Sequence, residues 1–221
     1  MKTSWKSRLK KILLGQGERL RKIPFGLYKN LFLLIDPACE TLLWLGLYER
    51  ETYPWLRKEG RKARTGIDVG AGHGELTLWL LRHRSMKQVY AFEPDAQRWA
   101  KFEANLAANP LDPDISLELS HEFFMGSKAK ETVQKAQEPI LLKIDIDGGE
   151  YDLLRELQEE LRNKDVHILL EVHSMELNEK CRVLLEGIDY KVSEIPMAWW
   201  RKFIPEQRPL GFNQWLVAAK K

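Results

Sequence analysis

Two short segments of this sequence combine residue types that suit the binding of a nucleotide-like ligand. Residues 65–75 form an apolar run that contains Asp68 and continues into three glycines, at every second position, before an amphipathic stretch. This order is typical of a strand that turns sharply into a helix around a nucleotide. Residues 89–95 form a second apolar strand ending in Glu93, which follows Asp68 by 25 residues. At about this separation, an acid in such folds reaches both hydroxyls of a ribose.

The glycine-rich turn predicts which residues contact the ligand. A Cβ at a glycine of this turn would keep the backbone away from the ligand, and such turns often need a positive φ. The alternative is a turn that binds nothing, but the acid on the next strand favours a binding site. We expect contacts from both segments: Asp68, Gly70, Ala71, Gly72, Gly74, Glu93 and Pro94.

Glu75 indicates which nucleotide is bound. A dinucleotide fingerprint has a third glycine where this chain has Glu75, and an acid at a helix start would repel a pyrophosphate. NAD is therefore disfavoured. A ligand with a ribose, no phosphate and a cationic sulfonium suits this acidic loop better.

A third segment, residues 139–150, places charged groups on a strand that is otherwise apolar. Side chains alternate along a strand, so Lys143, Asp145 and Asp147 share one face. A lysine within reach of both carboxylates would keep them charged at neutral pH. The alternative is a structural ion pair, but three ionisable groups in five residues are costly to bury without a function.

These segments together resemble the FkbM-type family of class I S-adenosylmethionine-dependent methyltransferases. The family signature is Lys-Ile-Asp-Val-Glu-Gly-Ala-Glu, and residues 143–150 resemble it with Asp147 in place of glutamate and Gly149 in place of alanine. The resemblance extends over residues 65–219. It includes further matches: residues 91–95, Asn105 with Asn109, and residues 169–173.

The resemblance implies a methyltransferase that binds S-adenosylmethionine, with Asp145 beside the cofactor. Two departures affect the adenine contacts: His73 stands where the family usually has asparagine, and residues 111–138 are short and lack the expected pattern. Methyl transfer is an in-line displacement that depends mostly on positioning, and a base is needed only for a hydroxyl acceptor.

The catalytic candidates are therefore Asp145, Lys143 and His173. His173 has an ordinary pKa that suits proton removal at neutral pH, although a histidine that only forms a structural hydrogen bond at a strand end is an equal alternative. Asp145, Asp147 and His173 could also converge on a divalent cation, and the absence of a metal is the favoured hypothesis.

The elements that would position these residues alternate between strand and helix. This alternation predicts a three-layer, doubly wound α/β domain over residues 61–221, with a mostly parallel seven-stranded sheet of the Rossmann-like methyltransferase type. The candidate residues should lie at the carboxyl edge of that sheet. Strands are predicted at 65–69, 88–93, 115–119, 140–146, 167–172, 190–195 and 214–219, the last antiparallel, and helices at 75–83, 96–109, 128–136, 150–162 and 175–186.

Residues 1–60 are predicted to form a helical extension. Residues 1–30 carry nine Lys or Arg and one Glu, and Leu9, Ile12, Leu13, Leu20 and Ile23 lie among them. This pattern suits a basic amphipathic helix on a membrane or polyanion, but packing on the domain is somewhat favoured. We expect no spanning segment and no signal peptide. Two separated cysteines favour a reducing cytosol, with peripheral membrane contact as an option.

Three classes of function remain. The leading one is O-methylation of a hydroxyl on a small molecule or glycan. The second is methylation of nucleic acid, including RNA ribose, with the basic arm holding phosphates. The third is a non-catalytic binding protein that retains the fold. Residues 196–205 carry Trp199, Trp200 and Phe203, which could either cover the acceptor site or pack on the N-terminal aromatic residues.

Overall fold

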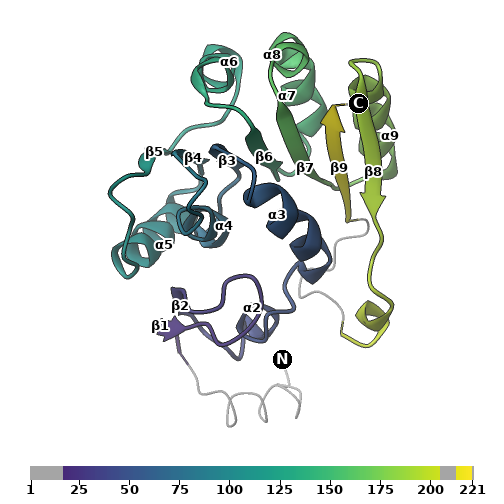
Figure 1. Ribbon diagram of the computed structural model, residues 1–221. Coiled ribbons are helices and arrows are strands. Elements are labelled where there is room, and N and C mark those ends of the chain that lie inside the picture. The colour runs from purple at the N-terminus through teal and green to yellow at the C-terminus, as the bar shows by residue number, and fades with distance from the viewer. Residues whose placement is uncertain (1–16, 205–212, 221) are drawn as a thin grey trace.

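The computed structural model describes residues 17–204 and 213–220, and it is built on one seven-stranded sheet (Figure 1). Six strands are parallel and β9 alone runs antiparallel to both of its neighbours. This confirms the predicted mostly parallel sheet and its antiparallel final strand. In sheet order the strands are β5 (Ser116–Ser120), β4 (Gln88–Phe92), β3 (Thr65–Val69), β6 (Ile140–Ile144), β7 (Val166–Val172), β9 (Gln214–Lys220) and β8 (Tyr190–Ile195).

Helices cover both faces of this sheet because its central strands are apolar on both sides. On β6, Ile140, Leu142 and Ile144 pack on one face with α6–α9, whereas Leu141 packs on the other with α3 and α4. The predicted helix over residues 150–162 is two helices, since the backbone leaves helical geometry at Leu157. The helices are α3 (Tyr53–Gly60), α4 (Glu75–Leu80), α5 (Ala96–Ala107), α6 (Gly126–Lys135), α7 (Glu150–Glu156), α8 (Gln158–Asn163) and α9 (Met175–Glu186), with the 3₁₀ turn η2 (Trp199–Lys202).

The expected helical extension is wrong for residues 17–35, which contain two strands, whereas residues 41–44 and 53–60 are helical. Residues 17–60 form the hairpin β1 (Arg19–Lys22) and β2 (Phe32–Ile35), the short α2 (Thr41–Trp44), the 3₁₀ turn η1 (Arg50–Thr52) and then α3. Prolines at 24 and 37 and glycines at 26 and 46 interrupt any longer helix. Leu33 and Ile35 are buried at the two-residue spacing of a strand.

We call residues 17–60 the N-terminal cap. Its hairpin and α2 lie at the lower side of Figure 1, and α3 lies beside the sheet. Of the five apolar residues of the predicted helix, Ile23 is buried and Leu20 is half exposed. Leu9, Ile12 and Leu13 lie outside the described residues. No helix in residues 17–204 or 213–220 is long and apolar enough to cross a membrane.

Asn105 and Asn109 of α5 dock the hairpin. Asn105 accepts a hydrogen bond from the Leu34 N–H and donates one to the His73 carbonyl. Asn109 accepts from the Phe32 N–H (3.0 Å) and donates to the Phe32 carbonyl (2.7 Å). Both asparagine side chains are buried. Their side chains therefore form the hydrogen bonds with the β2 backbone that a neighbouring strand would otherwise form.

Candidate active site

The carboxyl ends of β3, β6 and β7 meet at a cavity of about 230 Å³. Register places Asp68 of β3 directly beside Lys143 of β6. The N-terminal cap closes the other side of the cavity with Tyr28, Leu42, Leu43 and Glu49 among other residues. The predicted edge of the sheet is thus confirmed as the place where these residues gather, which is the usual position of ligands in open α/β sheets.

Asp68 lies on the floor of this cavity and is fully buried. Its Oδ2 accepts a hydrogen bond from Thr77 Oγ1 at 2.6 Å, and its Oδ1 lies 3.8 Å from Lys143 Nζ. Burial raises the pKa of Asp68, although Lys143 and Thr77 partly oppose the rise. Oδ1 has no hydrogen-bond partner within the described part of the chain. It is therefore a buried acceptor that a ligand donor could satisfy.

Lys143 connects the two strands. Its Nζ donates to the Gly70 carbonyl at 2.8 Å and lies 3.5 Å from Asp145 Oδ2. Burial would lower the pKa of Lys143, but Asp145 and Asp68 outweigh it and raise the pKa. Lys143 is therefore a fixed cation between Asp68 and Asp145. Of the two carboxylates predicted beside it, Asp145 is confirmed, whereas Asp147 approaches His173 instead.

The three glycines of the turn, Gly70, Gly72 and Gly74, differ in what a side chain would contact at each position. All have positive φ, from +58° to +85°. A Cβ on Gly70 would collide with the Asp145 carbonyl, and one on Gly74 would lie 2.1 Å from the Phe102 ring. A Cβ on Gly72 would meet open space, and Gly72 lines the cavity. Packing and positive φ therefore explain Gly70 and Gly74, whereas at Gly72 only the positive φ requires glycine, and its open side faces the cavity.

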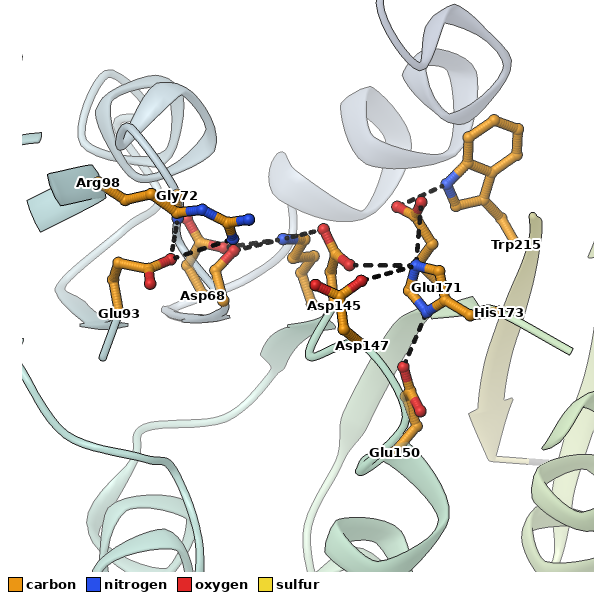
Figure 2. Close-up of polar contacts among 12 residues, drawn as sticks. Asp68, Gly72, Glu93, Arg98, Asp145, Asp147, Glu150, Glu171, His173 and Trp215 are labelled. Carbon is orange, nitrogen blue, oxygen red and sulfur yellow. Dashed lines mark hydrogen bonds and ion pairs between the residues drawn. The ribbon is translucent and has the colours of Figure 1, made fainter. Parts of the chain in front are cut away.

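Glu93 follows β4 and is 2% exposed. Its Oε2 accepts from the Gly72 N–H and its Oε1 from the Asp95 N–H, both at 2.8 Å. Arg98 lies 4.0 Å from Oε2 and lines the cavity, as Figure 2 shows. Pro94 is half-buried between Glu93 and the helix cap Asp95. Each carboxylate oxygen has a second lone pair, so Glu93 retains acceptor capacity beside the glycine turn.

A second group of ionisable side chains follows β6 and β7, and its members Asp145, Asp147 and Glu171 line the cavity. His173 is the centre of this group: its Nδ1 lies 3.0 Å from Glu150 Oε1, and its Nε2 lies 3.7 Å from Asp145 Oδ1 and 3.5 Å from Asp147 Oδ1 (Figure 2). The hydrogen bond to Glu150 raises the pKa of His173 and burial opposes the rise. The structure thus brings together all the predicted catalytic residues.

Glu171 belongs to the same group and had no role assigned from the sequence. Its Oε1 lies 3.7 Å from His173 Nε2, and its Oε2 accepts from Trp215 Nε1 at 3.3 Å. Burial, and then the nearby Asp145, raise the pKa of Glu171 to about 7. The available signal was an acid inside the apolar run of residues 166–172, the same signal that identified Asp145.

Glu49 of the N-terminal cap was also missed. It has a positive φ of 46°, which is uncommon for a residue with a side chain, and it lines the cavity. Burial and the charge of Glu171 raise its pKa well above the ordinary value, and Lys143 opposes this. No periodicity or motif in residues 1–60 indicates this placement.

The aromatic loop before β9 contacts the cap. Trp199 and Phe203 are each 76% exposed, whereas Arg201 points inward and pairs with Glu51 of the cap. Of the two roles left open for this loop, packing on the N-terminal residues is the one that the Arg201 contacts support.

Residues 127–196 match the family model described as the methyltransferase FkbM domain. No curated protein matches the sequence. Similar solved structures include a precorrin-6y C5,15-methyltransferase from Geobacter metallireducens GS-15, with a TM-score of 0.51, 16% identity and coverage of 73% of this chain and 82% of that chain.

Two further structures share the fold. M. jannaschii TYW2 in complex with AdoMet has a TM-score of 0.51, 15% identity and coverage of 92% and 84% of the two chains. An rRNA methylase from Streptococcus thermophilus has a TM-score of 0.50, 16% identity and coverage of 78% and 97%. The domain match over residues 127–196 and this fold together support an S-adenosylmethionine-dependent methyltransferase that resembles the FkbM type.

Proposed function

We propose that this enzyme transfers the methyl group to a hydroxyl of an uncharged or cationic small molecule or glycan. The observation that carries the proposal is the charge of the cavity. Its walls hold seven carboxylates against two cations, Arg98 and Lys143. A phosphate or carboxylate on the acceptor, brought beside Asp145 and Asp147, would be repelled at short range, where little water screens the charges.

The cofactor end of the cavity is the glycine turn. Gly72 leaves open space for close backbone approach, Glu93 offers acceptor oxygens for ribose hydroxyls, and Asp68 Oδ1 needs a donor. These features fit S-adenosylmethionine, whose sulfonium supplies the activated methyl group. Ala71 lines the same wall, and Asp145 stands between the cofactor end and the acceptor end.

The acceptor end is the group around His173. Nδ1 is held by Glu150, so Nε2 is the nitrogen directed toward Asp145 and Asp147. A hydroxyl bound beside Asp145 would lose its proton to His173 Nε2 as its oxygen forms the new bond to carbon. Lys143 keeps Asp145 ionised and fixed in position. Apolar walls from Leu42, Leu169 and their neighbours exclude water.

The nucleic-acid alternative is disfavoured by the same charges, although one solved structure of this fold is an rRNA methylase. A methyltransferase that acts on nucleic acid must hold the phosphates that flank its target near the mouth of the cavity, and the acidic residues here would oppose this.

A label-transfer experiment tests the proposal. The full chain is incubated with S-adenosylmethionine carrying a tritiated methyl group and with separate pools of total RNA, neutral glycans and neutral metabolites. We expect label in a neutral pool and none in RNA. Labelling of RNA, or of an anionic metabolite in preference to the neutral pools, would overturn the proposed acceptor class.

A further inference from the structure

We propose that Asp145, Glu171 and His173 form a binding site for a divalent cation at the acceptor end of the cavity. One ligand atom from each side chain lies within 4.8 Å of the other two. His173 Nε2 is 3.7 Å from both Asp145 Oδ1 and Glu171 Oε1. Ligands of one ion at about 2.1–2.3 Å lie about 3–4.5 Å apart, so these separations suit a shared cation.

His173 and Glu171 each have a second atom fixed by a group behind them. His173 Nδ1 is held by Glu150, whose side chain is fully buried, and Glu171 Oε2 is held by the indole N–H of Trp215. The remaining atoms, Nε2 and Oε1, are therefore directed toward each other across the site (Figure 2). Metal-binding histidines usually have this arrangement, with the far nitrogen bound to a carboxylate.

Asp145 is anchored in the same manner. Its Oδ2 faces Lys143 Nζ at 3.5 Å, and its Oδ1 faces His173 Nε2. Lys143 already donates to the Gly70 carbonyl, so it stands on the outer side of Asp145 and not between the three ligand atoms. The inner oxygen of Asp145 is thus presented to the site by a cation on its other side.

The three contacts at His173 Nε2 are too long for direct hydrogen bonds. This nitrogen lies 3.5–3.7 Å from one carboxylate oxygen of each of three residues, Asp145, Asp147 and Glu171. Hydrogen bonds from an imidazole N–H to oxygen are about 2.7–3.2 Å long. Oxygens at this distance leave room for a small cation between them and the nitrogen.

Glu171 is the strongest evidence that the centre is built for a ligand. Its side chain is 8% exposed, yet it lines the cavity together with Asp145 and Asp147. Buried carboxylates are normally paired or bound to a metal, and Lys143 is shared with Asp68 and Asp145. His173 Nε2 lies 3.7 Å from Glu171 Oε1, too far for a hydrogen bond, and a divalent cation between them would bind both atoms.

The ligand set indicates which cations would bind. Two carboxylate oxygens and one imidazole nitrogen suit Mn²⁺, or a related first-row divalent ion, better than Ca²⁺, which takes oxygen ligands almost alone. Asp147, with its side chain 60% exposed, stands close enough to add a fourth ligand. Coordination positions facing the cavity would then be open to an acceptor hydroxyl.

Binding of the cation does not depend on the proposed acceptor, but its role rests on the proposed function. With a cation bound, His173 would be a ligand, and the acceptor hydroxyl would release its proton to solvent. Without one, His173 would receive the proton itself. The two proposals therefore fail separately.

The test uses the full chain, freed of metal with a chelator and titrated with MnCl₂ by calorimetry, with the loss of the free Mn²⁺ electron paramagnetic resonance signal as a second readout. We expect one ion per chain. Glu171→Gln and His173→Gln should each weaken binding at least about 10-fold, whereas Glu118→Gln, which removes a carboxylate on the distant β5, should change it less than about 2-fold.

Folding of each variant is checked by its melting temperature without metal. Glu150→Gln is a second, independent test, because it removes the carboxylate that holds His173 Nδ1. Loss of such a carboxylate typically weakens metal binding about 10–100-fold. If Glu171→Gln does not fold, His173→Gln and Glu150→Gln decide the question. No binding of Mn²⁺ or Mg²⁺ at millimolar concentration, or binding that these variants weaken no more than Glu118→Gln does, would overturn the proposal.

Discussion

Arg201 forms a two-point ion pair with Glu51 that joins the loop before β9 to the N-terminal cap. Nε donates to Oε1 and NH2 donates to Oε2, both at 2.8 Å, and the two side chains are 5% and 4% exposed. The Ala198 N–H also donates to Glu51, and Arg201 donates to the Leu47 carbonyl. Since Leu47 and Glu51 flank Glu49, this pair positions the segment that brings Glu49 to the cavity.

Removal of one partner of this pair should destabilise the protein strongly. Glu51→Ala leaves the Arg201 charge buried, and such losses cost about 3–5 kcal/mol. Urea unfolding should show this decrease in the free energy of unfolding, while Glu118→Ala, which breaks exposed pairs with Lys128 and Lys135, should cost less than about 1 kcal/mol. A decrease as small as that of Glu118→Ala would mean that the cap does not depend on the pair.

The same pair should give the protein a measurable acid dependence. Burial alone would raise the pKa of Glu51, but hydrogen bonds from Arg201 and Ala198 outweigh it and lower the pKa. The stability is therefore fully present above the ordinary carboxyl pKa of about 4.3, and is lost as pH falls through the lower pKa of the folded state. The stability difference between wild type and Glu51→Gln should be constant from pH 7 to 5 and shrink below pH 4. A difference that stays constant down to pH 3 would contradict this.

Substitution of Asn105 should lower the stability of the protein without a direct effect on methyl transfer. Asn105→Ala removes the acceptor of the Leu34 N–H and the donor to the His73 carbonyl, both partly buried, and groups left unsatisfied away from water cost up to about 1–3 kcal/mol each. We expect lower stability in urea and a cap that is cleaved faster by trypsin. Gln97→Ala, on the exposed side of α5, is the control. Equal protease sensitivity of the two variants would show that the hairpin is held by other contacts.

The sheet could be predicted because its strands are marked by continuous apolar runs and its turns by glycine and acid. Boundaries of β3, β8 and the start of α9 agree with the prediction to the residue. The motif residues Asp68, Lys143 and Asp145 could be placed together because parallel strands bring their carboxyl ends to one edge. Local chemistry and topology therefore agreed in this part of the chain.

The N-terminal cap could not be predicted in this way. Its lysines and arginines suggested an amphipathic helix. The buried positions Leu33 and Ile35 instead follow the two-residue period of strand β2, which pairs with β1 in a hairpin. The role of Glu49 depends on the Glu51–Arg201 pair, whose members are 150 residues apart. No local pattern reports a contact over such a distance, so tertiary packing overrode the local signal.

Glu93 should contribute to cofactor affinity. A carboxylate that accepts charge-assisted hydrogen bonds from ribose hydroxyls contributes about 1.5–3 kcal/mol per bond, so Glu93→Ala should weaken S-adenosylmethionine binding at least about 10-fold by calorimetry. Arg98→Ala removes the cation beside Glu93 without removing the acceptor, and we expect it to keep most of the affinity. Unchanged affinity in Glu93→Ala would remove this residue from the site.

Alanine substitutions at Gly70 and Gly72 should separate an effect on folding from an effect on cofactor binding. Gly70→Ala would force a Cβ into the Asp145 carbonyl and should unfold the β3–β6 edge. Gly72→Ala meets no atom and suffers only the left-handed backbone penalty, about 1–2 kcal/mol, yet its methyl group would enter the space reserved for the ligand. We therefore expect Gly72→Ala to remain folded by circular dichroism and to lose most of its S-adenosylmethionine affinity. If Gly72→Ala binds the cofactor as well as wild type does, the cofactor does not approach the backbone at this turn.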